Sequence, residues 1–171
     1  KSKTDKIDAG NLAQMGLERK LAEWNPGSDQ MRTFKKLVRE RLRLQKEKTM
    51  VTNQLHSENK SHSPCPSITN RCEERIDFID QQIALIEKEL KEQVKKDKVL
   101  QERIDKVCTI PGVRFITAIG LIAETDGFAL FKNRSQLVSY AGYDVVKNES
   151  GKTTSKTKIS KKGNSYIRHM L

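Results

Sequence analysis

The residues best suited to chemistry lie in one short stretch, KNESGKTTSKTKISKKGN, which spans residues 147–164. It contains six lysines and six serine or threonine hydroxyls around two glycines. A hydroxyl surrounded by lysines is suited to attack a phosphodiester, because the cations stabilise the negative charge that develops on the phosphate. Ser150 precedes Gly151 at the centre of an expected hairpin turn, where its hydroxyl would be exposed.

Composition leaves a second interpretation of this stretch open. Its low hydrophobicity is typical of a disordered basic loop. Its position between apolar segments favours a folded loop instead. The sequence supplies no histidine close to Ser150 that could act as its base; His169 is a remote candidate and fits a surface position better.

A second set of candidates, Asp5 and Asp8, lies three residues apart at an expected helix start. Both carboxylates can therefore face the same way and share a divalent ion. Carboxylates in this position more often cap the helix or stabilise its dipole, so spacing alone does not make them metal ligands.

The whole chain has 171 residues, a net charge of +11, 32% charged residues and 5% aromatic residues. So few aromatic residues favour long, solvated helices over a compact globule. The basic excess predicts a polyanionic partner, and nucleic acid is the first expectation. We expect no membrane partner, because no apolar run approaches the roughly 20 residues of a span.

The three cysteines, Cys65, Cys72 and Cys108, are odd in number and lack a disulfide framework, which indicates a reducing, cytoplasmic location. His56 and His62 lie near two of them and could complete a zinc site. The tight paired spacing of structural zinc sites is missing, so a polar loop is the better interpretation.

The elements that must position these candidates are mainly helical. Residues 4–22 predict a short helix, and residues 31–57 predict a long one that a proline-containing turn ends. An alternating 3-4 apolar register of more than four heptads follows, interrupted only by Gln93 and Asp97. Its members are Ile76, Ile79, Ile83, Ile86, Leu90, Leu100, Ile104 and Val107. This pattern predicts an antiparallel coiled-coil hairpin, and its poorer first helix favours dimerisation.

A small helical domain is expected after Cys108, where the composition turns apolar. Residues 117–124 predict a buried helix and a second helix begins near Ser135. The sequences YDVV and TKI, on either side of the lysine-rich stretch, are candidates for a short β-hairpin. Residues 160–171 predict a closing helix.

The sequence IPGV before the apolar helix is typical of a helix-hairpin-helix element. In such an element, glycine lets the backbone N–H groups of a helix N-terminus approach and bind a phosphate. Gly112 and the neighbouring Arg114 are therefore candidate nucleic-acid contacts. A Pro-Gly turn before any helix would have the same sequence, so this contact stays one of two interpretations.

Three motifs, in order, carry a resemblance to a known family: KTDKIDAGNLA, IPGVRFITAIGLIAE and YAGY...SGK...ISKKGNSYIRHML. They resemble the DEDD-type insertion-sequence transposases of bacteria, the IS-one-ten family, whose members include the bridge-RNA-guided recombinases. The motifs cover about half of the chain, with the expected coiled coil between them. Two positions depart from the family pattern: Gly112-Val113-Arg114 replaces its GIG, and Val145 replaces a proline.

The resemblance implies a site made of carboxylates and a serine. Family members bind Mg²⁺ with four acidic residues, of which the last two correspond to Asp5 and Asp8. Their nucleophilic serine corresponds to Ser150. Five lysines around it become candidate phosphate contacts, together with Arg168. These lysines are Lys152, Lys156, Lys158, Lys161 and Lys162.

The resemblance also implies an organisation and partners. Residues 1–27 would be the end of a RuvC-like nuclease domain, 28–107 the coiled-coil hairpin, and 108–171 the C-terminal transposase domain. DNA, a guide RNA and a second subunit joined through the coiled coil would be its partners. Because the first two acidic residues would lie upstream, we expect this chain to be an inactive part of a longer protein.

Two functional hypotheses result. The first is a DNA transposase or recombinase that cuts and rejoins DNA with a serine and a Mg²⁺ site. The second is a non-enzymatic, dimeric, helical protein that binds nucleic acid through its basic loops.

Overall fold

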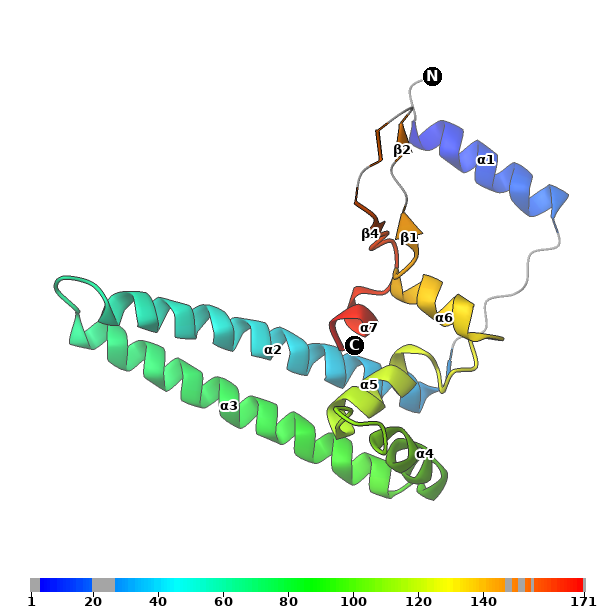
Figure 1. Ribbon diagram of the computed structural model, residues 1–171. Helices are drawn as coiled ribbons and strands as arrows, with labels where there is room; N and C mark the ends of the chain where they lie inside the picture. Colours follow the sequence, from blue (N-terminus) through cyan, green and yellow to red (C-terminus); the bar gives the residue numbers. More distant parts are fainter. Residues whose placement is uncertain (1–3, 20–26, 147–148, 151–152, 155, 171) are drawn as a thin grey trace.

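A computed structural model describes residues 4–19, 27–146, 149–150, 153–154 and 156–170. These residues form a mainly helical molecule with two short strand pairs (Figure 1). The helices are α1 (Asp5–Glu18), α2 (Asp29–Asn59), α3 (Pro66–Lys95), α4 (Lys98–Cys108), α5 (Phe115–Glu124), α6 (Arg134–Ala141) and α7 (Ser165–Met170). The strands are β1 (Val145–Val146), β2 (Glu149–Ser150), β3 (Thr153–Thr154) and β4 (Lys158–Ile159).

The two longest helices, α2 and α3, run side by side as an antiparallel hairpin (Figure 1). Ser28 starts α2, because its hydroxyl accepts a hydrogen bond from the Met31 N–H at 3.2 Å. Pro66 occupies the first turn of α3, where a missing N–H costs nothing. The antiparallel hairpin predicted from the sequence is therefore present.

The seam of the hairpin is closed within the chain. Its distal half is filled by a cluster of buried side chains from both helices. These are Val51, Cys72, Ile79 and Ile83. The apolar side chains of this part of the seam are thus buried within the chain, without a second subunit. Cys72 packs among them.

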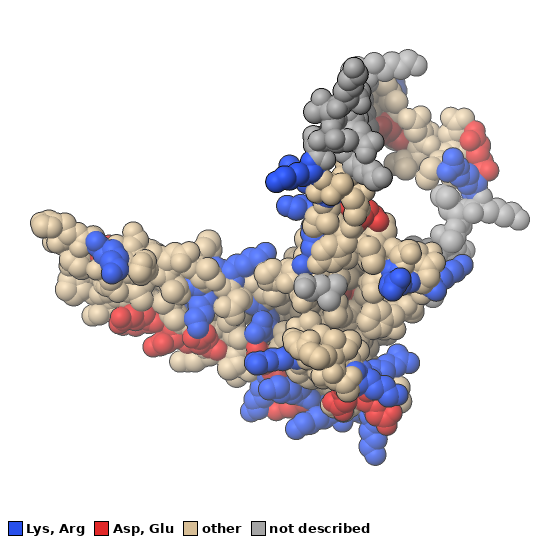
Figure 2. Space-filling model, in the orientation of Figure 1, with Lys and Arg blue, Asp and Glu red and all other residues tan. Residues whose placement is uncertain are grey.

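The two helices of the hairpin differ in charge. Lys and Arg outnumber Asp and Glu in α2, and the reverse holds in α3. Figure 2 shows acidic atoms along the lower, α3 side of the hairpin and basic atoms on its upper, α2 side, with further basic atoms around α4. The hairpin therefore presents unlike electrostatic faces.

The sequence pattern suggested one continuous helix for the long apolar register. The structure divides this register between two helices, α3 and α4. α3 ends at Lys95, and Asp97 caps a new helix by accepting a hydrogen bond from the Leu100 N–H at 3.0 Å. Val94 is fully buried and closes the first helix at its core side. Asp97, which interrupts the register, thus marks a corner between α3 and α4.

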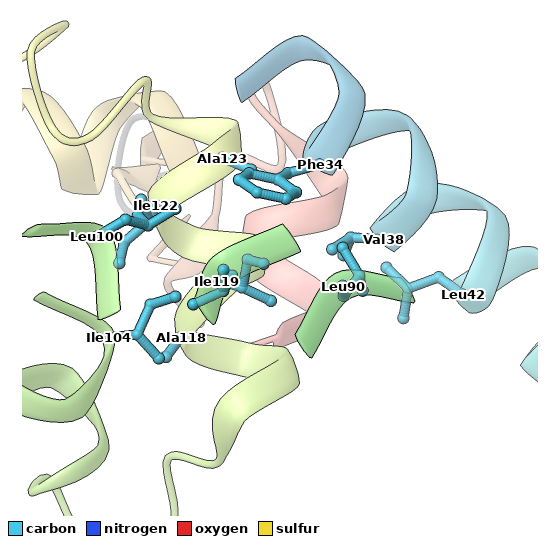
Figure 3. Packing of buried hydrophobic residues seen from close by; sticks show 11 residues of the cluster. Phe34, Val38, Leu42, Leu90, Leu100, Ile104, Ala118, Ile119, Ile122 and Ala123 are labelled. Carbon is cyan, nitrogen blue, oxygen red and sulfur yellow. The ribbon is translucent and has the colours of Figure 1, made fainter. Parts of the chain in front are cut away.

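The principal core lies where the hairpin meets the C-terminal helices (Figure 3). It draws buried residues from α2, α3, α4 and α5. They are Phe34, Val38, Leu42, Leu90, Val94, Leu100, Ile104, Ala118, Ile119, Ile122 and Ala123. The core therefore joins residues on both sides of the domain boundary expected near residue 107.

The C-terminal elements match the sequence expectation in kind. The buried helix α5 and the helix α6 lie where they were predicted, and β1 pairs with β4 as the two strand candidates. α7 is shorter than expected and starts at Ser165. A third cluster of Leu121, Ala141 and Ile167 joins α5, α6 and α7.

The helix α1 differs from the others, because it buries none of its residues. Its predicted cap is present: the Thr4 hydroxyl accepts a hydrogen bond from the Ile7 N–H at 3.4 Å. Its apolar residues are exposed, Leu17 at 89%. This helix presents a surface that the rest of the chain does not cover.

Candidate functional site

Ser150 ends strand β2 in a narrow two-stranded ribbon. β1 pairs antiparallel with β4 at the base of the ribbon, and β2 pairs with β3 farther out (Figure 1). Ser150 lies opposite Thr153. The turn predicted at Gly151, and Lys152 with it, lies outside the described residues. Strand β2, which Ser150 ends, lies at the far end of the ribbon from α6 and α7 (Figure 1).

Backbone hydrogen bonds fix the base of the ribbon to the end of α6. The Ser160 N–H donates to the Asp144 carbonyl at 2.7 Å, and the Lys161 N–H donates to the Gly142 carbonyl at 3.0 Å. Gly142 ends α6 in the left-handed conformation with φ of 74°, which suits glycine. The two strands therefore leave the helical body from a defined base.

Exposed lysines follow the returning strand. Lys156, Lys158, Lys161 and Lys162 are all exposed, as a phosphate-binding role requires. Arg168 is different: its Nη1 donates to the Ala141 carbonyl at 2.7 Å, and the residue is partly buried. Arg168 therefore helps to hold α7 against the end of α6.

The turn between α4 and α5 contains Gly112 and Arg114. Gly112 has φ of 87°, and the Val113 N–H donates to the Ile110 carbonyl at 3.0 Å, which closes the turn. Arg114 is exposed at the N-cap of α5, and it makes no side-chain cap. Both sequence-predicted residues thus lie together at the start of a buried helix.

Asp5 and Asp8 both lie in the first turn of α1, as their spacing predicted. Asp5 is exposed and Asp8 is half-buried. Carboxylate oxygens are the ligands that Mg²⁺ prefers, so the donor type fits a divalent metal. Among the described residues, however, no group of three or more His, Cys, Asp or Glu side chains could hold a metal ion. The two aspartates fit part of such a site.

A buried carboxylate that the sequence did not single out connects three helices. Glu124, the last residue of α5, is 1% exposed. Arg39 of α2 donates to it twice, from Nε at 2.6 Å and from Nη2 at 3.0 Å. Lys35 Nζ lies 3.3 Å from the same carboxylate, and Asn164 Nδ2 donates to it at 2.7 Å. The signal in the sequence was a lone acid ending an apolar helix, which must find a partner.

This carboxylate stays ionised because of its partners. Burial would raise the pKa of Glu124, but hydrogen bonds from Arg39 and Asn164 and the charge of Lys35 outweigh it. The pKa of Glu124 is therefore below its ordinary value. The hydrogen bond to Glu124 likewise raises the pKa of Arg39, whose guanidinium also lies 4.2 Å from the centre of the Tyr166 ring.

Two family models match the chain. One, described as Transposase IS116/IS110/IS902 family, matches residues 104–171. The other, described as Transposase and specific to DEDD-type IS110 proteins, matches residues 1–62. The chain belongs to the IS110-type transposases. No curated protein matches it.

The matches locate the transposase parts on the structure. The first covers the end of α4, all later helices and the strand ribbon, and the second covers α1 and α2. An IS110-type transposase is a DNA-processing protein, so DNA is its partner, and a DEDD domain depends on divalent metal in general. In the described part of this transposase, no helix is long and apolar enough to cross a membrane.

Proposed function

We propose that this transposase cuts and rejoins the DNA of an insertion sequence through Ser150 as its nucleophile. The observation that supports this most is the position of Ser150 at the outer end of the strand ribbon. Exposed Lys156 and Lys158 follow on the returning side. A DNA strand can reach such a site without displacing the helical core.

The chemical step is a displacement at phosphorus. The Ser150 Oγ forms a bond to the phosphorus and loses its proton, while the bond from phosphorus to the leaving DNA oxygen breaks. The leaving oxygen takes up a proton, and the DNA stays linked to the protein as a phosphoserine. Attack by a hydroxyl of another DNA strand reverses the step and rejoins the DNA. Lysine side chains offset the charge on the phosphate.

Asp5 and Asp8 are proposed as two ligands of a Mg²⁺ site that further acidic residues of the DEDD set complete. When bound, the metal would supply Lewis-acid stabilisation of the phosphate oxygens. The contribution of this chain is to hold two carboxylates one turn apart at the start of α1.

Replacing the nucleophile tests the first part. In a recombination assay with the full-length transposase, Ser150→Ala should abolish product formation and the covalent protein–DNA adduct. Thr157→Ala, which removes another hydroxyl of the same lysine-rich stretch at an exposed position, should retain both. Wild-type activity of Ser150→Ala would contradict the assignment, and DNA binding without recombination by the wild type would favour a non-enzymatic binding protein.

Replacing the carboxylates tests the second part. Asp5→Asn and Asp8→Asn should each raise the Mg²⁺ concentration needed for recombination or abolish activity. Asp29→Asn is the matched control, because Asp29 also lies in the first turn of a helix and is exposed. If all three variants lowered activity equally, the loss would come from a weakened helix start and not from lost metal binding.

A second subunit and a guide RNA complete the proposal. Phe78 and Leu85 are 60% and 59% exposed and lie seven residues apart on α3, so the hairpin has an uncovered apolar row for a coiled-coil partner. Phe78→Lys should shift the molecular mass measured by light scattering towards the monomer. The family resemblance and the net charge of +11 support an RNA partner. Ribonuclease treatment should then abolish recombination.

We also propose that Gly112 and Arg114 contact phosphate in the manner of a helix-hairpin-helix element. The uncapped start of α5 and the exposed Arg114 support this. The three-part organisation at residues 1–27, 28–107 and 108–171 stays a proposal, and the core shared across residue 107 indicates that the last two parts fold together.

A further inference from the structure

One face of α2 carries a row of cationic side chains that lies outside the proposed catalytic site. Its members are Arg32, Lys35, Lys36, Arg39, Arg43 and Lys46. Five of the six follow one another at alternating intervals of three and four, which places them on one side of a helix. At about 1.5 Å per residue the row is about 21 Å long, the axial length of about six phosphates of one DNA strand. We call it the α2 cationic row.

The surface is hollowed along this row. One hollow of about 420 Å³ is lined by Lys36, Arg39, Arg43 and Lys46 together with Tyr166 of α7. A second of about 430 Å³ is lined by the cations Arg32, Lys35, Lys36 and Arg39, by the acidic Glu124 and Asp126, and by Tyr140 of α6. Because Lys36 and Arg39 line both hollows, the hollows lie next to each other. We call these two adjacent hollows the groove beside the α2 cationic row.

The charges of the row are unequally compensated. Glu124 neutralises Arg39 and lies close to Lys35. These ion pairs hold the cations in the middle of the groove in place. Arg43 pairs with Glu40 at 2.7 Å, and Arg32 pairs with Asp29. Both arginine side chains are exposed, so a phosphate can compete for them.

Two lysines of the row keep their charge for a ligand. In the described part of the chain, Lys36 and Lys46 have no ion pair, and both side chains are exposed. They lie ten residues apart, one towards each end of the row. A long polyanion that follows the groove would meet both.

We propose that the α2 cationic row binds the sugar–phosphate backbone of DNA and so adds a contact surface on the hairpin to those proposed for the C-terminal part of the chain. This inference rests on the DNA function proposed above and extends it to the hairpin. The α3 side of the hairpin, by contrast, carries more Asp and Glu than Lys and Arg, so a polyanion is attracted more strongly to the α2 side. A backbone contact of this kind positions the DNA without selecting its sequence.

The test compares two double variants of the full-length transposase. Lys36→Gln with Lys46→Gln removes two charges from the row. Lys91→Gln with Lys95→Gln removes two charges from exposed positions of α3 and is the matched control. Binding to a fluorescein-labelled DNA duplex of mixed sequence is measured by anisotropy over a series of salt concentrations. An RNA duplex of the same length is measured in parallel, and circular dichroism checks that both variants keep their helix content.

The row variant should lose about tenfold in DNA affinity, and the slope of log affinity against log salt should fall by about two, one for each lost contact. The control should keep the wild-type slope. Equal slopes for both variants, with wild-type binding intact, would overturn the row and leave the Ser150 proposal untouched. Loss of RNA binding alone would overturn the assignment to DNA. Absence of DNA binding by the wild type would overturn both proposals.

Discussion

Glu124 links the C-terminal helices to α2 through polar contacts in addition to the apolar core. Its carboxylate receives hydrogen bonds from Arg39 and Asn164, which come from positions 85 and 40 residues away in the sequence. Asn164 in turn accepts from the Tyr166 N–H at 2.9 Å and so caps α7. One side chain therefore ties α2, α5 and the start of α7 together, directly below the strand ribbon.

Removing the charge of Glu124 should destabilise the fold. For Glu124→Gln we expect a loss of about 2 kcal/mol in the free energy of unfolding, less than the about 3–5 kcal/mol of a fully buried pair because Arg39 still reaches water. Urea denaturation measures it. Asp80→Asn, which breaks the exposed pair with Lys48, should cost under about 1 kcal/mol. Equal losses of unfolding free energy for the two variants would mean that the buried pair of Glu124 stabilises the fold no more than an exposed pair does.

The pKa of Glu124 predicts how its contribution depends on pH. Because its folded pKa lies below the unfolded value of about 4.3, its stabilisation is fully present above that pH. It is lost as the pH falls further, through the folded pKa. The difference in unfolding free energy between wild type and Glu124→Gln should therefore be constant near neutral pH and narrow below about pH 4. A difference that stays constant down to pH 3 would contradict this.

Among the elements, the ribbon base depends on the close approach of two backbones. Gly163 faces the end of α6: a side-chain carbon there would lie 2.6 Å from the Gly142 nitrogen and 3.0 Å from the Ala141 carbonyl carbon. Neighbouring backbone cannot give way as a flexible side chain can. Position 163, between the ribbon and α7, thus has room only for glycine.

Gly163→Ala should therefore displace the returning strand. We expect a loss of about 1–3 kcal/mol in the free energy of unfolding, as for other overpacked sites, and reduced recombination because Ser150 lies on the same ribbon. The control is Gly10→Ala in α1, where nothing lies within 4 Å of the new carbon. Urea denaturation of both variants checks the prediction. An unchanged stability of Gly163→Ala would show that the contact relaxes at no cost.

What the sequence could predict at this level was local. Apolar spacing predicted α2, α3, α5 and the packing of residues such as Ile79 and Leu90, because helical periodicity needs only near neighbours. By apolar spacing alone Asp97 interrupts one helix, although an aspartate before a helical segment is also a cap signal. The partners of Glu124 could not be predicted, because they depend on how distant helices pack.

The candidate site was predictable only in part. Spacing placed Asp5 and Asp8 on one helical turn, and the Ser-Gly pair predicted a hairpin turn at Ser150, which the structure places at the end of β2. The choice of Ser150 over five other hydroxyls came from the family resemblance. The α2 cationic row was also present in the sequence, at intervals of three and four, but general charge excess concealed it until the groove beside it was known.

The molecule as a whole combines a long hairpin with a helical end that shares its core. Leu90 of α3 and Ile119 of α5 are fully buried in the same cluster (Figure 3). Between them the chain turns the corner at Asp97 and passes the exposed turn at Gly112. The hairpin is thus a rigid support for the C-terminal helices, and one face of it bears the α2 cationic row.

This shared core predicts that a change in α3 reaches α5. Leu90→Ala should cost about 2–5 kcal/mol and should lower the hydrogen-exchange protection of the Ile119–Ala123 amides together with those of α3. Lys91→Ala, at an exposed position next to Leu90 on the same helix, should change neither. If Leu90→Ala lowered protection in α3 while α5 kept its wild-type protection, the hairpin and the C-terminal helices would open as separate units. The boundary near residue 107 would then divide two domains, and DNA held on α2 could move relative to Ser150.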